Sequence, residues 1–154
     1  EGKTLSTAES VTGGGLAAMI VSVPGASNVF QEGFVAYSNE AKIEHLGVDP
    51  VSIERYGAVS SEVCTEMALG ARKSAGTDFA LSTTGIAGPQ GRTASKPVGL
   101  CFVGLAAPNG IFCSRLQLHG GRELVRWRTA ASALDLMRLC LLGEEERLKP
   151  FSVT

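Results

Sequence analysis

The sequence has 154 residues, of which 44% are hydrophobic and 19% are charged, and its formal net charge is −1. This composition is that of a globular chain and excludes an intrinsically disordered protein. The near-zero charge gives no electrostatic reason to expect nucleic acid or an anionic membrane as a partner. At this length we expect a single domain over residues 1–154 with a substantial buried core.

The first predicted elements are a strand over residues 3–9, a turn with three consecutive glycines at Gly13–Gly15, and a helix over residues 16–22. Glycines let a ligand approach the main chain closely, and the first N–H groups of a helix lack intrahelical partners and favour negative charge. Ser10 and Thr12 are therefore expected beside an anion or oxyanion site. The alternative is that Ser10 or Thr12 only caps the helix.

The uncharged stretch over residues 10–31 is long enough to cross a membrane. Gly13–Gly15 and Pro24-Gly25 interrupt it, and its continuous apolar part is short. We therefore expect no membrane association and no signal peptide.

Strands and helices alternate along the rest of the chain. The predicted elements are a strand over 33–38, helices over 40–46 and 51–56, a long helix from Ser60 to Gly76, strands over 79–83, 98–106 and 111–118, and a last helix over 122–142. Asn109-Gly110 between apolar runs is a strong hairpin signal. This order predicts an α/β fold, a three-layer α/β/α sandwich with a mixed sheet. Ligands in such folds bind at strand ends, where both glycine-rich loops lie, after the first strand and at residues 84–88.

The cysteine and histidine positions argue against a metal site. No two cysteines stand at C-x-x-C spacing, and His45 and His119 are far apart in the sequence. We therefore expect no metal and no other cofactor. Scattered cysteines in a chain with enough core residues predict buried, reduced thiols and a cytoplasmic protein.

Three side chains are candidates for a nucleophilic site. Ser10 lies in the glycine turn, Tyr37 ends a predicted strand, and Lys42 lies on the helix that follows it. A serine nucleophile needs a base, and no His–Asp pair is plausible here. We expect His45 to be a surface or packing residue, the alternative being that it lines the site, and His119 to be structural or ligand-facing. A neutral lysine can serve if burial or a nearby cation lowers its pKa from about 10.4. The alternatives are a solvated Lys42 and a Tyr37 that packs on the sheet.

Six motifs in order carry a resemblance to a known family: Thr7–Gly14, Gly33–Lys42, Gly57–Ser60, Thr84–Pro89, Lys96–Gly99 and Gly121-Arg122. With these motifs the sequence is similar to the CinA C-terminal domain, a family that includes stand-alone nicotinamide-mononucleotide amidases. The resemblance extends from residue 4 to about residue 141. Val11 stands where the family usually has Cys, and residues 90–93 lack the usual paired glycines.

The resemblance implies an amidohydrolase that converts nicotinamide mononucleotide and water into nicotinate mononucleotide and ammonia through an acyl-enzyme. It implies that Ser10 is the nucleophile, Lys42 the base, and Tyr37 a residue that orients or relays the proton. We expect these three groups within hydrogen-bond reach of one another. Backbone N–H groups near Thr12 and Gly13 would hold the oxyanion.

The expected substrate-binding residues come from both glycine-rich loops and the last helix: Thr12, Gly13, Gly14, Thr84, Gly85, Ala87, Gly88 and Arg122. The second loop and Arg122 would hold ribose or phosphate. We expect a small pyridine nucleotide as the partner, no nucleic acid, no membrane, and a homo-oligomer. The alternatives are a non-catalytic nucleotide-binding or regulatory module of the same fold, and an assembly domain whose long helices serve as interfaces.

Overall fold

A mixed sheet forms the middle layer of the computed structural model, which describes residues 2–144. Within those residues the sheet has five strands in the order β2-β1-β3-β4-β5. They are β1 (Leu5–Glu9), β2 (Phe30–Val35), β3 (Phe79–Gly85), β4 (Leu100–Ala107) and β5 (Gly110–Gln117). β1 pairs in parallel with β2 and β3, while β3–β4 and β4–β5 are antiparallel.

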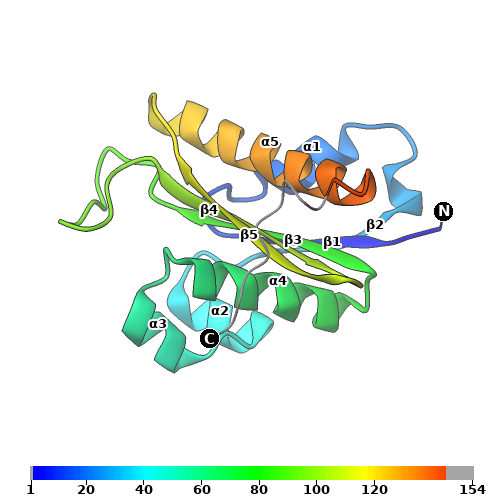
Figure 1. Ribbon diagram of the computed structural model, residues 1–154, viewed down its shortest axis with the longest axis horizontal. Helices are drawn as coiled ribbons and strands as arrows, with labels where there is room; N and C mark the ends of the chain where they lie inside the picture. The colour runs from blue at the N-terminus through cyan, green and yellow to red at the C-terminus, as the bar shows by residue number, and fades with distance from the viewer. Residues whose placement is uncertain (1, 145–154) are drawn as a thin grey trace.

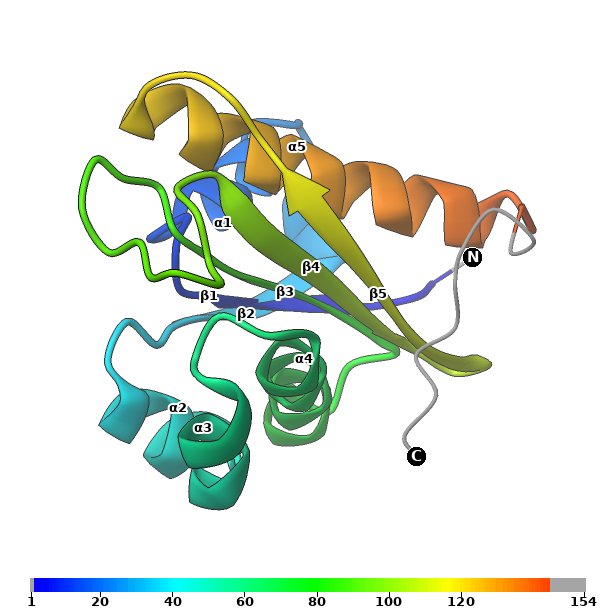
Figure 2. The same cartoon turned by 60° about the vertical axis from the view of Figure 1, so that its left-hand side comes forward.

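Helices cover both faces of the sheet (Figures 1 and 2). One face carries α1 (Gly15–Val21) and α5 (Arg122–Leu141), and a 3₁₀ turn, η1 (Ala26–Asn28), follows α1. The other face carries α2 (Asn39–Leu46), α3 (Pro50–Tyr56) and α4 (Ser61–Ala75). The predicted α/β/α sandwich with a mixed sheet is therefore confirmed.

The central strands are buried on both sides because each face of the sheet is covered. Every residue of β1 and β4 is buried, which is why these strands lack a polar–apolar alternation. Between the sheet and α1/α5 the core includes Leu16, Leu105 and Leu136. On the opposite face Val63 and Met67 of α4 are fully buried against the sheet.

The predicted elements are all present, and all but one have bounds within two residues of those expected. The strand expected over residues 33–38 begins at Phe30 and ends at Val35. Ser38 cannot extend it, because its hydroxyl accepts a hydrogen bond from the Ala41 N–H (3.0 Å) and caps α2. Tyr37 therefore lies in a connection and not in a strand. The predicted domain of residues 1–154 extends beyond the described residues at both ends.

Replacing Gly70 by alanine is expected to destabilise the fold. A Cβ at Gly70 would lie 1.8 Å from the Leu46 carbonyl oxygen, where α2 packs on α4. The overpacking should lower the free energy of unfolding by about 2 kcal/mol, despite the better helix propensity of alanine. Urea unfolding measures this, with Gly15→Ala as the matched control, because a Cβ there meets nothing within 4 Å. A Gly70→Ala protein as stable as the parent would contradict the packing of α2 on α4.

Candidate active site

The first glycine-rich turn joins the end of β1 to α1. Gly13 and Gly14 have φ values of +58° and +99°, which other residues rarely adopt. The Gly13 N–H donates to the Ser10 carbonyl (3.0 Å), and the Ser10 N–H donates to the Thr83 carbonyl of β3 (3.0 Å). The turn is thus tied to the neighbouring strand, and Ser10 lies at the end of two parallel strands.

The N-terminus of α1 is occupied by a side chain of the protein itself. The buried Glu9 carboxylate accepts hydrogen bonds from the N–H groups of Leu16 (2.7 Å) and Ala17 (3.0 Å). The expected anion site at this helix N-terminus is therefore wrong, because Glu9 already satisfies these donors. The alternative of a Ser10 or Thr12 cap is also wrong, since Gly14 stands at the N-cap and makes no side-chain cap.

The side chain of Thr12 is buried and bonded to other side chains of the protein. Its buried hydroxyl donates to Glu9 Oε1 (2.6 Å) and lies 2.7 Å from the Thr83 hydroxyl. The Gly13 N–H is engaged by Ser10, whereas the Thr12 N–H has no acceptor within residues 2–144. Of the two N–H groups expected at the oxyanion, only that of Thr12 is available.

A cavity of about 250 Å³ lies at the ends of β1 and β3, between the two glycine-rich loops. It brings together most of the predicted site residues: Ser10, Tyr37, Lys42, Thr84, Gly85, Ala87, Gly88 and Arg122. Val11 also lines it and is buried in an apolar cluster with Ala87, which suits an apolar residue at this position. Thr12, Gly13 and Gly14 do not line it.

Lys42 is not a solvated helix residue, because it is only 1% exposed. Its ammonium group donates to three successive carbonyls, those of Ala36 (3.0 Å), Tyr37 (3.3 Å) and Ser38 (3.5 Å). Burial lowers the pKa of Lys42, and the negative charge of Glu40 opposes part of this effect. The environment therefore favours a neutral amine more than water does.

The three candidate catalytic groups share one cavity but do not bond to one another. Within the described residues, no hydrogen bond joins the Ser10 hydroxyl to Lys42 or to Tyr37. The side chain of Tyr37 is 62% exposed, and its hydroxyl accepts a hydrogen bond from Arg122 Nη2 (3.1 Å). Proton transfer between Ser10 and Lys42 would thus require a shift of a side chain or an intervening water.

Arg122 connects the second glycine-rich loop to Tyr37. Its Nη1 donates to the Gly88 carbonyl (2.9 Å), while Nη2 donates to the Tyr37 hydroxyl. Gly88 has φ +82°, and a Cβ there would lie 2.5 Å from Val98. The loop therefore needs glycine at this position, and Arg122 fixes the loop at the cavity rim.

Lys96 anchors the far side of the same loop. Its ammonium group donates to the carbonyls of Tyr56 and Val59, the latter at 2.7 Å. Thr84, at the end of β3, donates its hydroxyl to the Ala58 carbonyl (2.8 Å). The second loop is thus held against the connection between α3 and α4, and one wall of the cavity has a fixed position.

Two residues that the sequence analysis did not single out shape the turn. Glu9 caps α1 as described above. Arg126 of α5 donates from Nε to the Val11 carbonyl (3.1 Å) and from Nη2 to the Thr12 carbonyl (2.9 Å). The sequence could have pointed to Arg126 through its position four residues after Arg122, because residues at this spacing lie on the same face of a helix.

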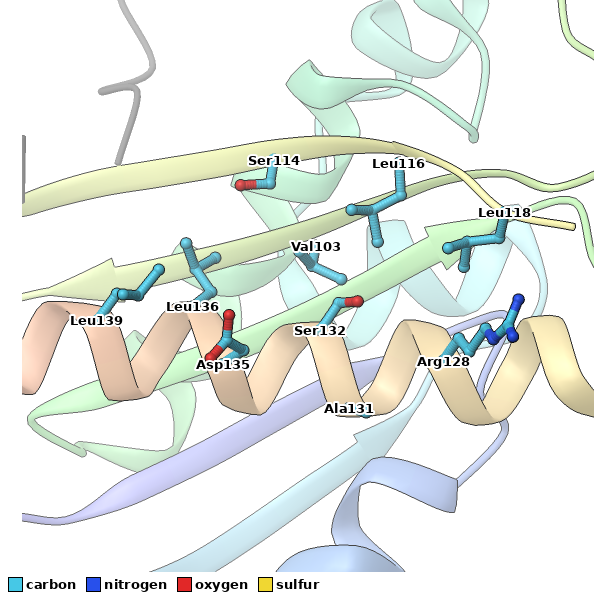
Figure 3. Close-up of a pocket in the computed structure, with 10 residues that line it drawn as sticks. All are labelled: Val103, Ser114, Leu116, Leu118, Arg128, Ala131, Ser132, Asp135, Leu136 and Leu139. Atoms are coloured by element: carbon cyan, nitrogen blue, oxygen red, sulfur yellow. The ribbon is translucent and has the colours of Figure 1, made fainter. Parts of the chain in front are cut away.

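A second cavity, of about 440 Å³, lies where α5 faces β4 and β5 (Figure 3). Leu136 and Leu139 of α5 line it from one side and Leu116 from the other. Arg128 and Asp135 supply its charged groups. None of the predicted site residues lines this cavity, so it is separate from the Ser10 site.

The remaining sequence expectations concern metals, membranes and thiols. Within residues 2–144, no group of three or more His, Cys, Asp or Glu side chains is placed to hold a metal ion. In the same part of the chain, no helix is both long and apolar enough to cross a membrane. All the cysteines are free, as predicted: Cys64, Cys101 and Cys140 are buried and Cys113 is partly buried.

Comparison with known proteins identifies similar sequences. The family model of the CinA C-terminal domain matches residues 1–141. A CinA-like protein of Kosmotoga olearia is 54% identical over 141 residues, which cover 92% of this chain and 34% of that protein. The chain spans about a third of the length of the curated relatives it matches.

Solved structures agree with the fold. The competence/damage inducible protein CihA of Agrobacterium tumefaciens is 40% identical with a TM-score of 0.86, over 88% of this chain and 84% of that chain. A competence-damaged protein (CinA) superfamily protein of Escherichia coli is 33% identical with a TM-score of 0.86, over 90% and 81% of the two chains. The arrangement of strands and helices is therefore shared with these proteins.

Proposed function

This chain belongs to the CinA C-terminal domain family, and from that premise we propose that it is an amidohydrolase acting on nicotinamide mononucleotide. The products are nicotinate mononucleotide and ammonia. The observation that supports the proposal most is the buried amine of Lys42 in the wall of the cavity that Ser10 lines. A lysine with a lowered pKa is a suitable base for a serine where no histidine is available.

In the acylation step the Ser10 oxygen attacks the carboxamide carbon, and its proton passes to the neutral Lys42 amine. The carbonyl oxygen becomes an oxyanion in a tetrahedral intermediate. The C–N bond then breaks, and the nitrogen takes the proton from the Lys42 ammonium and leaves as ammonia. The three carbonyls around Nζ stabilise the ammonium form that exists between these two transfers.

Deacylation uses the same groups with water as the nucleophile. Lys42 accepts a proton from water as the oxygen attacks the Ser10 ester. Collapse of the second intermediate breaks the ester bond, returns the proton from Lys42 to the Ser10 oxygen and releases the carboxylic acid, which loses its proton to solvent. Tyr37 orients the base through its main-chain carbonyl, which accepts a hydrogen bond from Lys42, and its hydroxyl is positioned by Arg122.

The rest of the nucleotide would bind along the second loop. Among the described residues, Arg122 uses two of its guanidinium nitrogens, for the Gly88 and Tyr37 contacts. The remaining donors and its positive charge suit a phosphate or ribose oxygen at the cavity rim. We further propose that the chain works in the cytoplasm as a homo-oligomer.

One observation favours the alternative of a non-catalytic nucleotide-binding module. Among the described residues, the Lys42 ammonium donates to three main-chain carbonyls and makes no hydrogen bond to Ser10. A lysine held permanently in this way would act as a structural cation. The two functions share the cavity and differ only in turnover.

The test is ammonia release from nicotinamide mononucleotide by the purified chain, with nicotinamide riboside as a matched substrate that lacks the phosphate. We expect release from the nucleotide and a much higher KM for the riboside, since a charged hydrogen bond to phosphate would be lost. Binding of the nucleotide by calorimetry without ammonia release would support the non-catalytic module. Neither binding nor release would exclude this substrate.

A further inference from the structure

Arg126 contacts the Ser10 turn from outside the Ser10 cavity. It does not line the Ser10 cavity, whereas it does line a separate cavity of about 420 Å³ between α1 and α5. Its guanidinium donates to two consecutive carbonyls of the turn, those of Val11 and Thr12. Gly13 permits this approach, because a Cβ there would lie 3.3 Å from Arg126 Nη2. Arg126 therefore acts on the main chain of the turn and would not touch a substrate in the Ser10 cavity.

The two hydrogen bonds fix the orientation of two peptide groups. In a trans peptide the C=O and N–H bonds point in opposite directions. Holding the Thr12 carbonyl towards Arg126 directs the Gly13 N–H away from α5, and this N–H does donate to the Ser10 carbonyl. By the same geometry, holding the Val11 carbonyl towards Arg126 directs the Thr12 N–H away from the guanidinium. The Thr12 N–H has no acceptor within the described residues. It belongs to the same peptide group as the carbonyl of Val11, which lines the Ser10 cavity, so it can reach an oxyanion there although Thr12 itself does not line that cavity.

We propose that Arg126 is a positioning residue that orients and polarises the Thr12 N–H as an oxyanion donor for Ser10. A cation on the Val11 carbonyl withdraws electron density from the peptide group that carries the Thr12 N–H, and this strengthens the N–H as a donor. A pre-oriented donor costs no reorganisation when negative charge develops in the transition state. The inference rests on the proposed function only in that Ser10 is the nucleophile.

The experiment measures the reactivity of Ser10 with a fluorophosphonate, besides ammonia release. In this reaction the Ser10 oxygen bonds to phosphorus, fluoride leaves, and the serine proton passes to Lys42, while a phosphoryl oxygen takes the oxyanion position. Arg126→Gln is expected to lower both the labelling rate and kcat about 10- to 100-fold, with little change in KM. Arg126→Lys should recover part of both rates, because it keeps the charge but not the two-pronged contact.

Arg138→Gln is the matched control. Arg138 lies on the same helix, is exposed and pairs only with Asp135 among the described residues. We expect it to label and turn over at the parent rate. Equal labelling of the parent and Arg126→Gln, at matched thermal stability, would overturn the proposal, as would a parent whose Ser10 does not label. Labelling that depends on Arg126 in a chain that releases no ammonia would support this inference and refute the proposed substrate.

A second measurement covers the case in which Arg126→Gln does not fold. In the phosphonylated parent, the Thr12 amide proton should shift downfield relative to the free protein, because it then donates to the phosphoryl oxygen, whereas it has no acceptor among the described residues of the free protein. The Gly13 amide proton, which donates to Ser10 in both states, should move much less. An unshifted Thr12 resonance would overturn the proposal without any variant.

Discussion

Replacing Ser10 by alanine is expected to lower ammonia release from nicotinamide mononucleotide by about 10⁴-fold or more, because the acyl-enzyme can no longer form. The fold should be retained. The main-chain bonds of the turn, from the Ser10 N–H to Thr83 and from the Gly13 N–H to the Ser10 carbonyl, do not use the hydroxyl. The measurement is steady-state ammonia release by the parent and the variant, with thermal unfolding of both proteins.

Ser22→Ala is the matched control for Ser10→Ala. Ser22 is an exposed serine at the other end of α1, and its hydroxyl bonds only to the Met19 carbonyl among the described residues. This variant should turn over at the parent rate. Substantial activity in a folded Ser10→Ala protein would show that another group is the nucleophile.

Replacing Lys42 by methionine is the second change with a large expected effect. Methionine keeps most of the buried volume but cannot accept a proton, so kcat should fall about 10²- to 10⁴-fold. Thermal unfolding should show some loss of stability as well, since three main-chain carbonyls lose their donor. Lys73→Met serves as the control, because Lys73 is an exposed lysine in the last turn of α4.

The pH dependence of the parent tests the same role of Lys42. The neutral amine is the reactive form, so kcat/KM should rise with pH as Lys42 loses its proton. Burial lowers the pKa of Lys42, and the midpoint of the rise should therefore lie below the ordinary lysine value of about 10.4. In Lys42→Met this rise should disappear. A variant with the rate and pH profile of the parent would exclude Lys42 as the base.

The sequence predicted much of the candidate site because the site is built from local motifs. Ser10 lies in a glycine turn after a strand, and the loop over residues 84–88 follows another strand; both features are visible over fewer than ten residues. Parallel strands place their carboxyl ends at one edge of a sheet, so both loops had to meet there. This is why most of the predicted residues line one cavity.

The sequence analysis was wrong about interactions that depend on where a single side chain points. The helix N-terminus after the glycine turn had the features of an anion site, but the Glu9 carboxylate occupies it. The predicted contact between Ser10 and Lys42 is replaced by three bonds from Lys42 to main-chain carbonyls. In both cases a nearby polar partner satisfies the group, and hydrogen-bond satisfaction of buried groups outweighs the pattern.

The sequence by itself determined the order of strands and helices, the α/β/α sandwich and the two glycine-rich loops, since hydrophobic periodicity and turn residues report interactions between near neighbours in the chain. Only the tertiary structure decided the burial of Lys42, the link from Arg122 to Gly88 and the contact of Arg126 with the Ser10 turn. Arg126 and Val11 are 115 residues apart. No local pattern specifies such a pair, because the packing of α5 beside α1 brings the guanidinium to the carbonyls of the turn.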